Sequence, residues 1–530
     1  MQLKKIVLAC AAALTLPMTA HAVAPANAFD TAGALTVFMS GATAPDEFLQ
    51  GIMTGMLNPG FYSFTNVSTA GTEYRAFLGE IKADASIPAN LHNQKILFIK
   101  RSKNGSVFGV NPVARDQNIQ TMNLSATVCT SAQSVDTATA PSVPTDFTNP
   151  TFVISCPTIG QDPSQGNIGG EMKPDFGVSD VNPFMFKEPF NVEYLATQLA
   201  PNEVAGLTVR SVNTLMMGYA TTAAVPETTI LSKADYAGML SKNIKQWSKV
   251  GATMPAGKDG VVVCRRWPGS GTQTSYNWYF NNFPCTSASA TSGVSGDVAP
   301  GRMDESFGFA SYVNGDGSGV DAANSIGIDP SAGYTIIENS GSGDVRKCLK
   351  AAQAGTKYSF KGEDNLFYEA DFSIGAGGYG AIAVLSLDSQ TKTSDGAESS
   401  WFFRPAEGKG RFYKATQDCR IGGAAGAVTE SGVCPNRSNL RDGHYDFAAE
   451  LTMQYLTSKH AVGSQKLSFI NELIDRAGDP ALQALWTLAL PPTYLPTATI
   501  GVEGYDGALV AKANRDGDVG NMCKPLARKY

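Results

Sequence analysis

The residues with the clearest chemical potential lie in the stretch Val261–Phe280, which reads VVVCRRWPGSGTQTSYNWYF. Arg266 carries a planar guanidinium group that can donate two hydrogen bonds to a tetrahedral oxyanion. The Gly-Ser-Gly-Thr run at 269–272 lets backbone amides converge and adds two hydroxyl donors. This pattern predicts a cradle for an oxyanion, although the same run is also typical of a simple helix cap.

Two further stretches of small residues favour the anion cradle. Ser40–Pro45 follows an apolar strand and precedes a helix, and Asp175–Asp180 ends in a carboxylate. An ionised Asp180 can only accept hydrogen bonds. It would therefore accept one from a protonated phosphate and repel fully ionised sulfate, which predicts selectivity between these two anions.

Alternating strands and helices are expected to position these loops. A strand at Val261–Val263 would lead to a helix that begins near Thr272 and aims its free amides at the loop. Further strands are expected at Leu35–Met39, Val209–Thr221 and Tyr379–Leu387, and helices from Pro45 and over Ser232–Trp247, Tyr445–Leu456 and Leu467–Leu490. Ser232 and Asp235 have the spacing of a capping box, and Gly478-Asp479-Pro480 breaks the last helix. Alternating elements of this kind predict an α/β fold with a partly parallel sheet.

Length, charge and hydropathy limit the classes of protein. A chain of 530 residues is expected to form two lobes. Residues 1–22 have the basic start, apolar run and Ala-His-Ala ending of a signal peptide, and their removal would change the net charge from −6 to −8. An acidic exported chain is not expected to bind nucleic acid or anionic membranes. No later segment reaches the roughly 20 apolar residues that cross a bilayer, so no membrane insertion is expected.

The cysteine content fits an oxidising compartment. Cys10 would leave with the signal peptide, and the remaining eight cysteines predict disulfides. Connectivity cannot be derived from sequence, and the local pairs are the preferred guess. The expected pairs are Cys129–Cys156, Cys264–Cys285, Cys419–Cys434 and, by remainder, Cys348–Cys523.

No pattern indicates catalysis, a metal or a cofactor. The chain contains no Gly-x-Ser-x-Gly motif and no Cys-x-x-Cys pair, and the histidines that follow the signal peptide are dispersed at His92, His444 and His460. The run Lys100–Gly109 is expected to be a hairpin turn, with a second anion contact as the alternative. Asn314–Gly319 holds half of a calcium-loop pattern but lacks its closing glutamate, so an ordinary turn is expected.

The three loops together resemble those of the periplasmic phosphate-binding proteins of ABC transporters, the PstS-like type II solute-binding proteins. The similar motifs are SGATAPDEF at Ser40–Phe48, DFGVSD at Asp175–Asp180 and RRWPGSGTQTSY at Arg265–Tyr276. The motifs keep the order of the family along the chain. The resemblance implies that inorganic phosphate, or a related oxyanion, is bound without a cofactor in a cleft between two lobes and delivered to an ABC permease.

The resemblance also implies a set of binding residues, with VSTAG at 67–71 taken as a serine-bearing loop. These residues are Thr43, Ser68, Thr69, Asp180, Arg266, Ser270, Gly271 and Thr272. Pro268 departs from the pattern, because the family usually has an acid there that anchors the arginine. Ala44 also departs from it, since a bulky aromatic residue is usual at that position.

The implied architecture is a two-lobe type II fold with mixed sheets and long insertions. Lobe one would comprise residues 29–218 and 441–530, with an insertion at 84–170. Lobe two would comprise 219–440, with an insertion-rich part at 286–370. The chain would cross between the lobes near 217–220 and 442–447. The expected location is the periplasm; the protein would instead be secreted or lie at the cell surface if it has kept the fold for a structural or adhesive role. A secreted phosphatase is the third hypothesis for the function.

Overall fold

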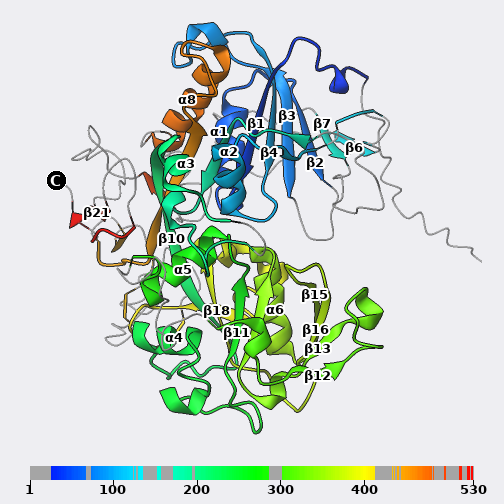
Figure 1. Cartoon of the computed structure of the whole chain (residues 1–530), viewed down its shortest axis with the longest axis vertical. Coiled ribbons are helices and arrows are strands. Elements are labelled where there is room, and N and C mark those ends of the chain that lie inside the picture. The colour runs from blue at the N-terminus through cyan, green and yellow to red at the C-terminus, as the bar shows by residue number, and fades with distance from the viewer. Residues whose placement is uncertain are drawn as a thin grey trace, which may run out of the picture.

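A computed structural model describes most of the chain. The described residues are chiefly 26–66, 73–122, 131–134, 152–156, 171–193, 197–285, 301–411 and 443–479, with shorter pieces between and beyond them. They form two halves, an upper one and a lower one in Figure 1, with strand β10 (Leu207–Thr222) running through both. Among the described residues, no helix has the length and apolar character needed to cross a membrane.

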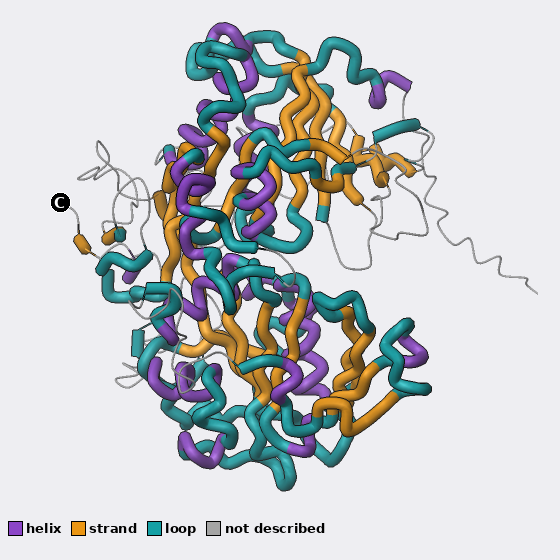
Figure 2. The backbone as a smooth tube through the Cα atoms, in the orientation of Figure 1, coloured by secondary structure: helices purple, strands orange, loops and turns teal. Residues whose placement is uncertain are grey.

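Fourteen strands of the described residues form one mixed sheet, which continues from the lower half into the upper half (Figure 2). The upper half contains β1 (Leu35–Gly41), β2 (Tyr62–Asn66), β3 (Tyr74–Glu80), β4 (Lys95–Arg101), β6 (Ser131–Ser134), β7 (Phe152–Cys156) and β9 (Phe176–Ser179). The lower half contains β11 (Val262–Arg266), β14 (Thr335–Asn339), β17 (Ala381–Ser386) and β18 (Trp401–Arg404). β19 (Ala448–Leu456) and β20 (Tyr494–Pro496) pair with β10.

Parallel strands form the centre of each half. β1 lies parallel to both β4 and β9, and β11 lies parallel to both β14 and β17. Strands of this kind are buried on both faces and therefore read as continuous apolar runs. The expected mixed α/β fold is confirmed, as are the strands at Leu35–Met39, Val209–Thr221 and Tyr379–Leu387.

Helices cover the sheet in both halves. The upper half has α1 (Asp46–Gly55), α2 (Asn111–Ala114), α3 (Pro201–Ala205) and α8 (Gln465–Gly478); the lower half has α4 (Lys233–Leu240), α5 (Gly271–Asn281) and α6 (Ser342–Ala354). The predicted capping box at Ser232 is confirmed, but α4 ends at Leu240 instead of reaching Trp247. The predicted break after Gly478 is also confirmed, because α8 ends there.

The prediction of a helix over Tyr445–Leu456 is wrong. Residues Ala448–Leu456 form β19, which lies between β10 and β9 and is buried along most of its length. Its residues alternate between apolar side chains at 449, 451, 453 and 455 and polar ones at Glu450, Thr452 and Gln454, which is the period of a strand and the signal that the helix prediction missed. Pairing with two neighbouring strands decided the structure of this segment.

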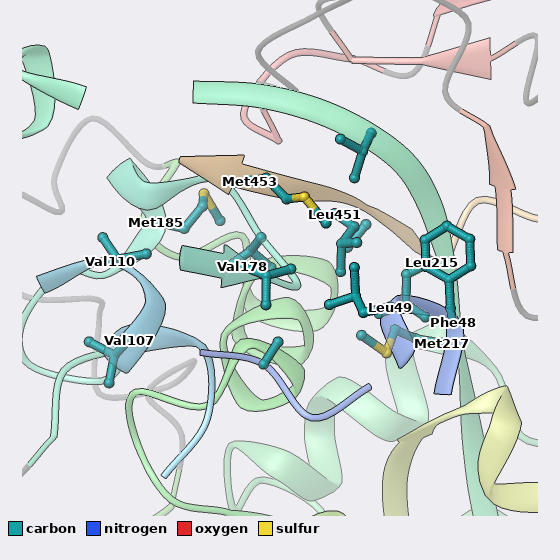
Figure 3. Close-up of a cluster of buried hydrophobic side chains, with 14 of the residues drawn as sticks. Phe48, Leu49, Val107, Val110, Val178, Met185, Leu215, Met217, Leu451 and Met453 are labelled. Carbon is teal, nitrogen blue, oxygen red and sulfur yellow. The ribbon is translucent and has the colours of Figure 1, made fainter. Parts of the chain in front are cut away.

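The largest hydrophobic core joins the middle of the sheet to the helices around it. Figure 3 shows Phe48 and Leu49 from α1 near Leu215 and Met217 from β10, and all four side chains are buried. β10 pairs with β19 as far as Met216 and with β17 from Met217 onward. The core therefore surrounds the point at which β10 changes partners.

A smaller four-stranded sheet projects from the lower half. It contains β12 (Phe309–Val313), β13 (Ile326–Ile328), β15 (Lys357–Lys361) and β16 (Phe367–Asp371). Two short pairs complete the strands, β5 (Ile119–Gln120) with β8 (Glu171–Met172) and β21 (Ala513–Asn514) with β22 (Ala527–Arg528). The segment Asn314–Gly319 is a turn in which Asp316 accepts the amide of Ser318 at 3.0 Å, in agreement with the prediction for it.

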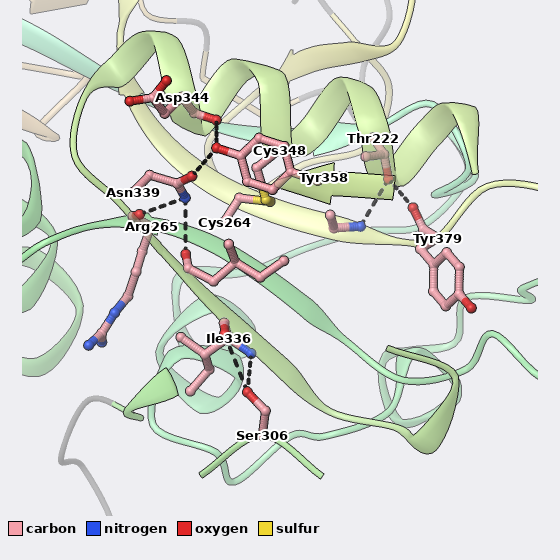
Figure 4. Close-up of a disulfide and its surroundings, with 12 residues drawn as sticks. Thr222, Cys264, Arg265, Ser306, Ile336, Asn339, Asp344, Cys348, Tyr358 and Tyr379 are labelled. Atoms are coloured by element: carbon pink, nitrogen blue, oxygen red, sulfur yellow. Dashed lines mark hydrogen bonds between the residues drawn. A yellow bond between two sulfur atoms is a disulfide. The ribbon is translucent and has the colours of Figure 1, made fainter. Parts of the chain in front are cut away.

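Three disulfides are described, and two of the predicted pairs are wrong. Cys129–Cys156 is confirmed, whereas Cys264 pairs with Cys348 and Cys285 pairs with Cys523. Cys264 lies within β11 and Cys285 follows α5, and each of them bonds a cysteine far along the chain, 84 and 238 residues away. Cys264 instead meets α6, which packs on β11 (Figure 4). The predicted Cys419–Cys434 pair lies outside the described residues.

Candidate functional site

The carboxyl ends of the parallel strands in the two halves meet at one place. In the upper half, β1, β4 and β9 end there, and in the lower half β11 and β14 do. The loop after β4 reaches the loop after β11, because the backbone N–H of Val107 donates to the carbonyl oxygen of Gly269 at 3.0 Å. Ligands of open parallel sheets bind outside these strand ends, so the predicted loops lie where a ligand site is expected.

Asp180 follows β9 and lies at the centre of this contact. Its side chain is buried, its backbone N–H donates to Ser106 Oγ at 3.2 Å, and its Oδ1 accepts no hydrogen bond from the described residues. Burial raises the pKa of Asp180 to about 6, although Arg266, Ser106 and Lys100 oppose the shift. The site therefore contains a buried acceptor that is ionised at neutral pH and available to a ligand.

The amino end of α5 faces Asp180. Ser270 caps the helix and accepts the amide of Gln273 at 3.4 Å, and the first-turn side chain of Thr272 is buried. A Cβ atom at Gly271 would come within 2.6 Å of the Asp180 Cβ, so only glycine fits there. The free amides of the first turn and the positive end of the helix dipole point toward the contact between the halves.

Arg266, the last residue of β11, brings a buried positive charge to the same contact. Its Nη2 donates to the carbonyl oxygen of Ser340 at 2.7 Å and its Nη1 to Ser342 Oγ at 3.1 Å. Its Nε is buried and has no partner among the described residues. Burial lowers the pKa of Arg266 to about 10, and Asp180 acts against this shift. Ser340 and Ser342, which follow β14, therefore orient the guanidinium.

Thr43 lies on the neighbouring loop, after β1. Gly41 is in register with Val178, and the Ala42 amide donates to the Val178 carbonyl at 2.9 Å, so Thr43 and Asp180 follow adjacent parallel strands. The Lys100 ammonium is buried beneath this loop and donates to the carbonyl oxygen of Ala42 at 3.0 Å. Thr43 itself is partly exposed. The loop is therefore held by buried contacts while its threonine stays accessible.

Ser106 is a site residue that the sequence reasoning did not select. The run Lys100–Gly109, expected to be a hairpin turn, instead contains the end of β4 and a short 3-10 helix, Ser106–Gly109. Gly105 has a φ of +87°, and a Cβ there would lie 3.4 Å from Arg266 Nη2. The base, serine and glycine after an apolar strand were the available signal for a loop that reaches Asp180 and Arg266. Ser68 and Thr69 lie outside the described residues.

Glu193 adds a carboxyl group that no motif indicated. A Cβ at Gly269 would lie 2.6 Å from the Glu193 Cγ, so this side chain packs on the Gly-Ser-Gly-Thr loop. Burial raises the pKa of Glu193 to about 8; Glu363 adds to the shift, and Arg101 and Arg266 oppose it. Two carboxyl groups thus pack against one short loop, Glu193 at Gly269 and Asp180 at Gly271.

Comparisons with known proteins give only distant matches. No family model matches the chain, and no curated protein matches it. Among solved structures, an ABC-type phosphate transport receptor from Vibrio cholerae shows 12% identity over 60% of this chain and 79% of its own, with a TM-score of 0.28. A phosphate-binding protein from Stenotrophomonas maltophilia shows 12% identity over 80% and 79%, with a TM-score of 0.31.

A third structure, a high-affinity periplasmic phosphate-binding protein bound with phosphate (PfluDING), shows 11% identity over 87% of this chain and 90% of its own, with a TM-score of 0.36. At such identities and TM-scores the likeness does not assign a ligand to this chain. A ligand can be inferred only from the residues around Asp180 and Arg266.

Proposed function

We propose that this protein binds inorganic phosphate, or a closely similar oxyanion, between its two halves. The observation that supports the proposal most directly is the meeting of three groups. Arg266 supplies a buried charge, the first turn of α5 supplies free amides, and Asp180 supplies a buried acceptor whose Oδ1 is not used by the described residues. Donors alone would suit any oxyanion, whereas the acceptor suits one that carries a proton.

The ligand-binding residues in this proposal are those of the three loops together with Ser106. Thr43 and Ser106 come from the upper half, and Ser270, Gly271 and Thr272 come from the lower half. Binding without covalent chemistry is part of this proposal, because the set consists of hydrogen-bond donors and an acceptor around the anion. The role of Ser68 and Thr69 remains part of the same proposal.

Closure of two lobes is the proposed means of enclosing the ligand. The proposed lobes are 29–218 with 441–530, and 219–440, with crossings near 217–220 and 442–447. The change of partner in β10 between Met216 and Met217 supports the first crossing. Export to the periplasm and delivery to an ABC permease complete the proposed role.

Titration calorimetry of phosphate-stripped protein tests this function. Phosphate should bind at micromolar concentration or below at neutral pH, and sulfate should give no signal. Arg266→Ala should abolish phosphate binding, whereas Arg210→Ala, which changes an exposed arginine of β10, should leave it unchanged. Absence of binding for both anions in the wild-type protein would overturn the proposal and favour a structural or adhesive role.

A further inference from the structure

A cavity of about 410 Å³ adjoins the anion loop. Pro268 and Glu193 line it, and Gly269, which follows Pro268, packs directly on Glu193. Its walls come from both halves, since residues 188–193 belong to the loop after β9, whereas Arg265 and Glu338 end strands of the lower sheet. A volume of this size is in the range of pockets that hold small organic ligands.

The cavity has an excess of negative charge. Six carboxyl groups of the described residues line it: Glu188, Glu193, Asp304, Glu338, Glu363 and Asp364. Two guanidinium groups of the described residues line it, and each of them already forms an ion pair, Arg265 with Glu338 and Arg302 with Asp304. Aromatic side chains of Phe190, Phe309 and Tyr368 complete the wall. This lining is suited to a small organic group with a positive charge.

Two buried polar atoms on the wall have no partner among the described residues, which distinguishes the cavity from a merely acidic surface. One is Oε1 of Glu193 and the other is Nε of Arg265. Arg265 is only 6% exposed, and its side chain points away from the Cys264–Cys348 disulfide and α6 (Figure 4). Glu193 Oε1 is an acceptor with which an ammonium group can pair, whereas Arg265 Nε is a donor that needs water or an oxygen of the ligand.

We infer that the ligand is a phosphate monoester whose organic group carries an ammonium, with the phosphate in the anion loop and the ammonium in this cavity beside Glu193. The inference rests on the proposed function, because it extends the same phosphate site. A monoester is required because its monoanion, which the second pKa of about 6 leaves as the minor form at pH 7, has an O–H to donate to Asp180, whereas a diester has no such O–H. Glu193 is then the residue that determines specificity for the organic group.

The protonation of Glu193 supplies a second observable. Burial raises its pKa to about 8, with Glu363 acting in the same direction and Arg101 and Arg266 against it, so the empty site holds a proton at pH 7. An ammonium ion beside this carboxyl group favours its ionised form. Binding of the amine should therefore release a proton that an ester with an uncharged organic group does not release.

The test compares O-phosphoethanolamine with ethyl phosphate and inorganic phosphate by calorimetry on the phosphate-stripped, full-length protein. O-phosphoethanolamine should bind at least about tenfold more tightly than ethyl phosphate, because only it places a charge at Glu193. The ratio of the two affinities should fall to about one in Glu193→Gln. Titrations in buffers of different ionisation enthalpy should show greater proton release for the amine than for ethyl phosphate.

Each outcome decides the inference. If the wild-type protein binds inorganic phosphate but binds O-phosphoethanolamine and ethyl phosphate with equal affinity, the inference is overturned. This measurement requires no variant. A preference that survives in Glu193→Gln overturns the role of Glu193. Glycerophosphoethanolamine, a diester from lipid, should bind at least about tenfold more weakly than the monoester, and equal binding overturns the monoester assignment. Failure of inorganic phosphate to bind overturns the proposed function and the inference with it.

Discussion

Gly271 and Asp180 lie so close together that a Cβ atom on Gly271 would come within 2.6 Å of the Asp180 Cβ and 2.9 Å of its Oδ2. One residue begins α5 in the lower half and the other follows β9 in the upper half. The positive end of a helix is therefore held against a buried carboxylate. Predictions about the site follow from this pair and from the contacts that support it.

Gly271→Ala should weaken phosphate binding at least about tenfold, because the added methyl group would push the first turn of α5 away from Asp180. Calorimetry with the folded variant measures the effect. Gly478→Ala is the matched control. Gly478 is the last residue of α8, and a Cβ atom there would lie 3.4 Å from its nearest neighbour, the carbonyl oxygen of Val212. Unchanged phosphate affinity in Gly271→Ala would contradict the assigned site.

Discrimination against sulfate should depend on pH through Asp180. Above its pKa of about 6, Asp180 is ionised and can only accept hydrogen bonds, so sulfate, which has no proton to donate, leaves it without a partner. Below that pH the protonated carboxyl group can donate a hydrogen bond to a sulfate oxygen. Sulfate affinity should therefore rise at least about tenfold from pH 7.5 to pH 5. In Asp180→Asn the sulfate affinity should not change over this range. A wild-type protein that rejects sulfate equally at both pH values would refute the role of Asp180.

Lys100→Met should destabilise the fold by about 3 kcal/mol, because it removes one partner of a buried ion pair. The Lys100 ammonium lies 3.3 Å from the Asp46 carboxylate, and both side chains are buried. Lys95→Met, at the exposed start of the same strand, removes an ion pair with Asp30 and should cost less than about 1 kcal/mol. Urea denaturation compares the two variants, and similar losses would show that burial of this pair does not matter.

Removal of the Cys264–Cys348 disulfide by alanine at both positions should lower the free energy of unfolding by about 2–5 kcal/mol. The disulfide joins β11 to α6, and both cysteines are fully buried. Peptide mapping under non-reducing conditions should recover Cys264 linked to Cys348 and Cys285 linked to Cys523. Recovery of a Cys264–Cys285 peptide would contradict this arrangement.

The local features of the site could be predicted from the sequence. Ser270 caps α5 as its Gly-Ser-Gly-Thr context predicts, and Ser232 forms its expected capping box. The apolar runs that became β1, β10 and β17 were also recognised. In each case the determining contacts lie within a few residues of one another, so that propensity and spacing are sufficient to predict the element.

Contacts between distant segments were decided only by the tertiary structure. Ser106 joins the site because β4 lies beside β1, and Arg266 is oriented by Ser340 and Ser342 because β14 lies beside β11. Cys264 bonds Cys348, 84 residues further along the chain, because α6 packs on β11. The sequence by itself determined which residues could bind an oxyanion and which local turns present them. Strand pairing and helix packing decided which of them meet, because these long-range contacts depend on the burial of whole elements and leave no local pattern.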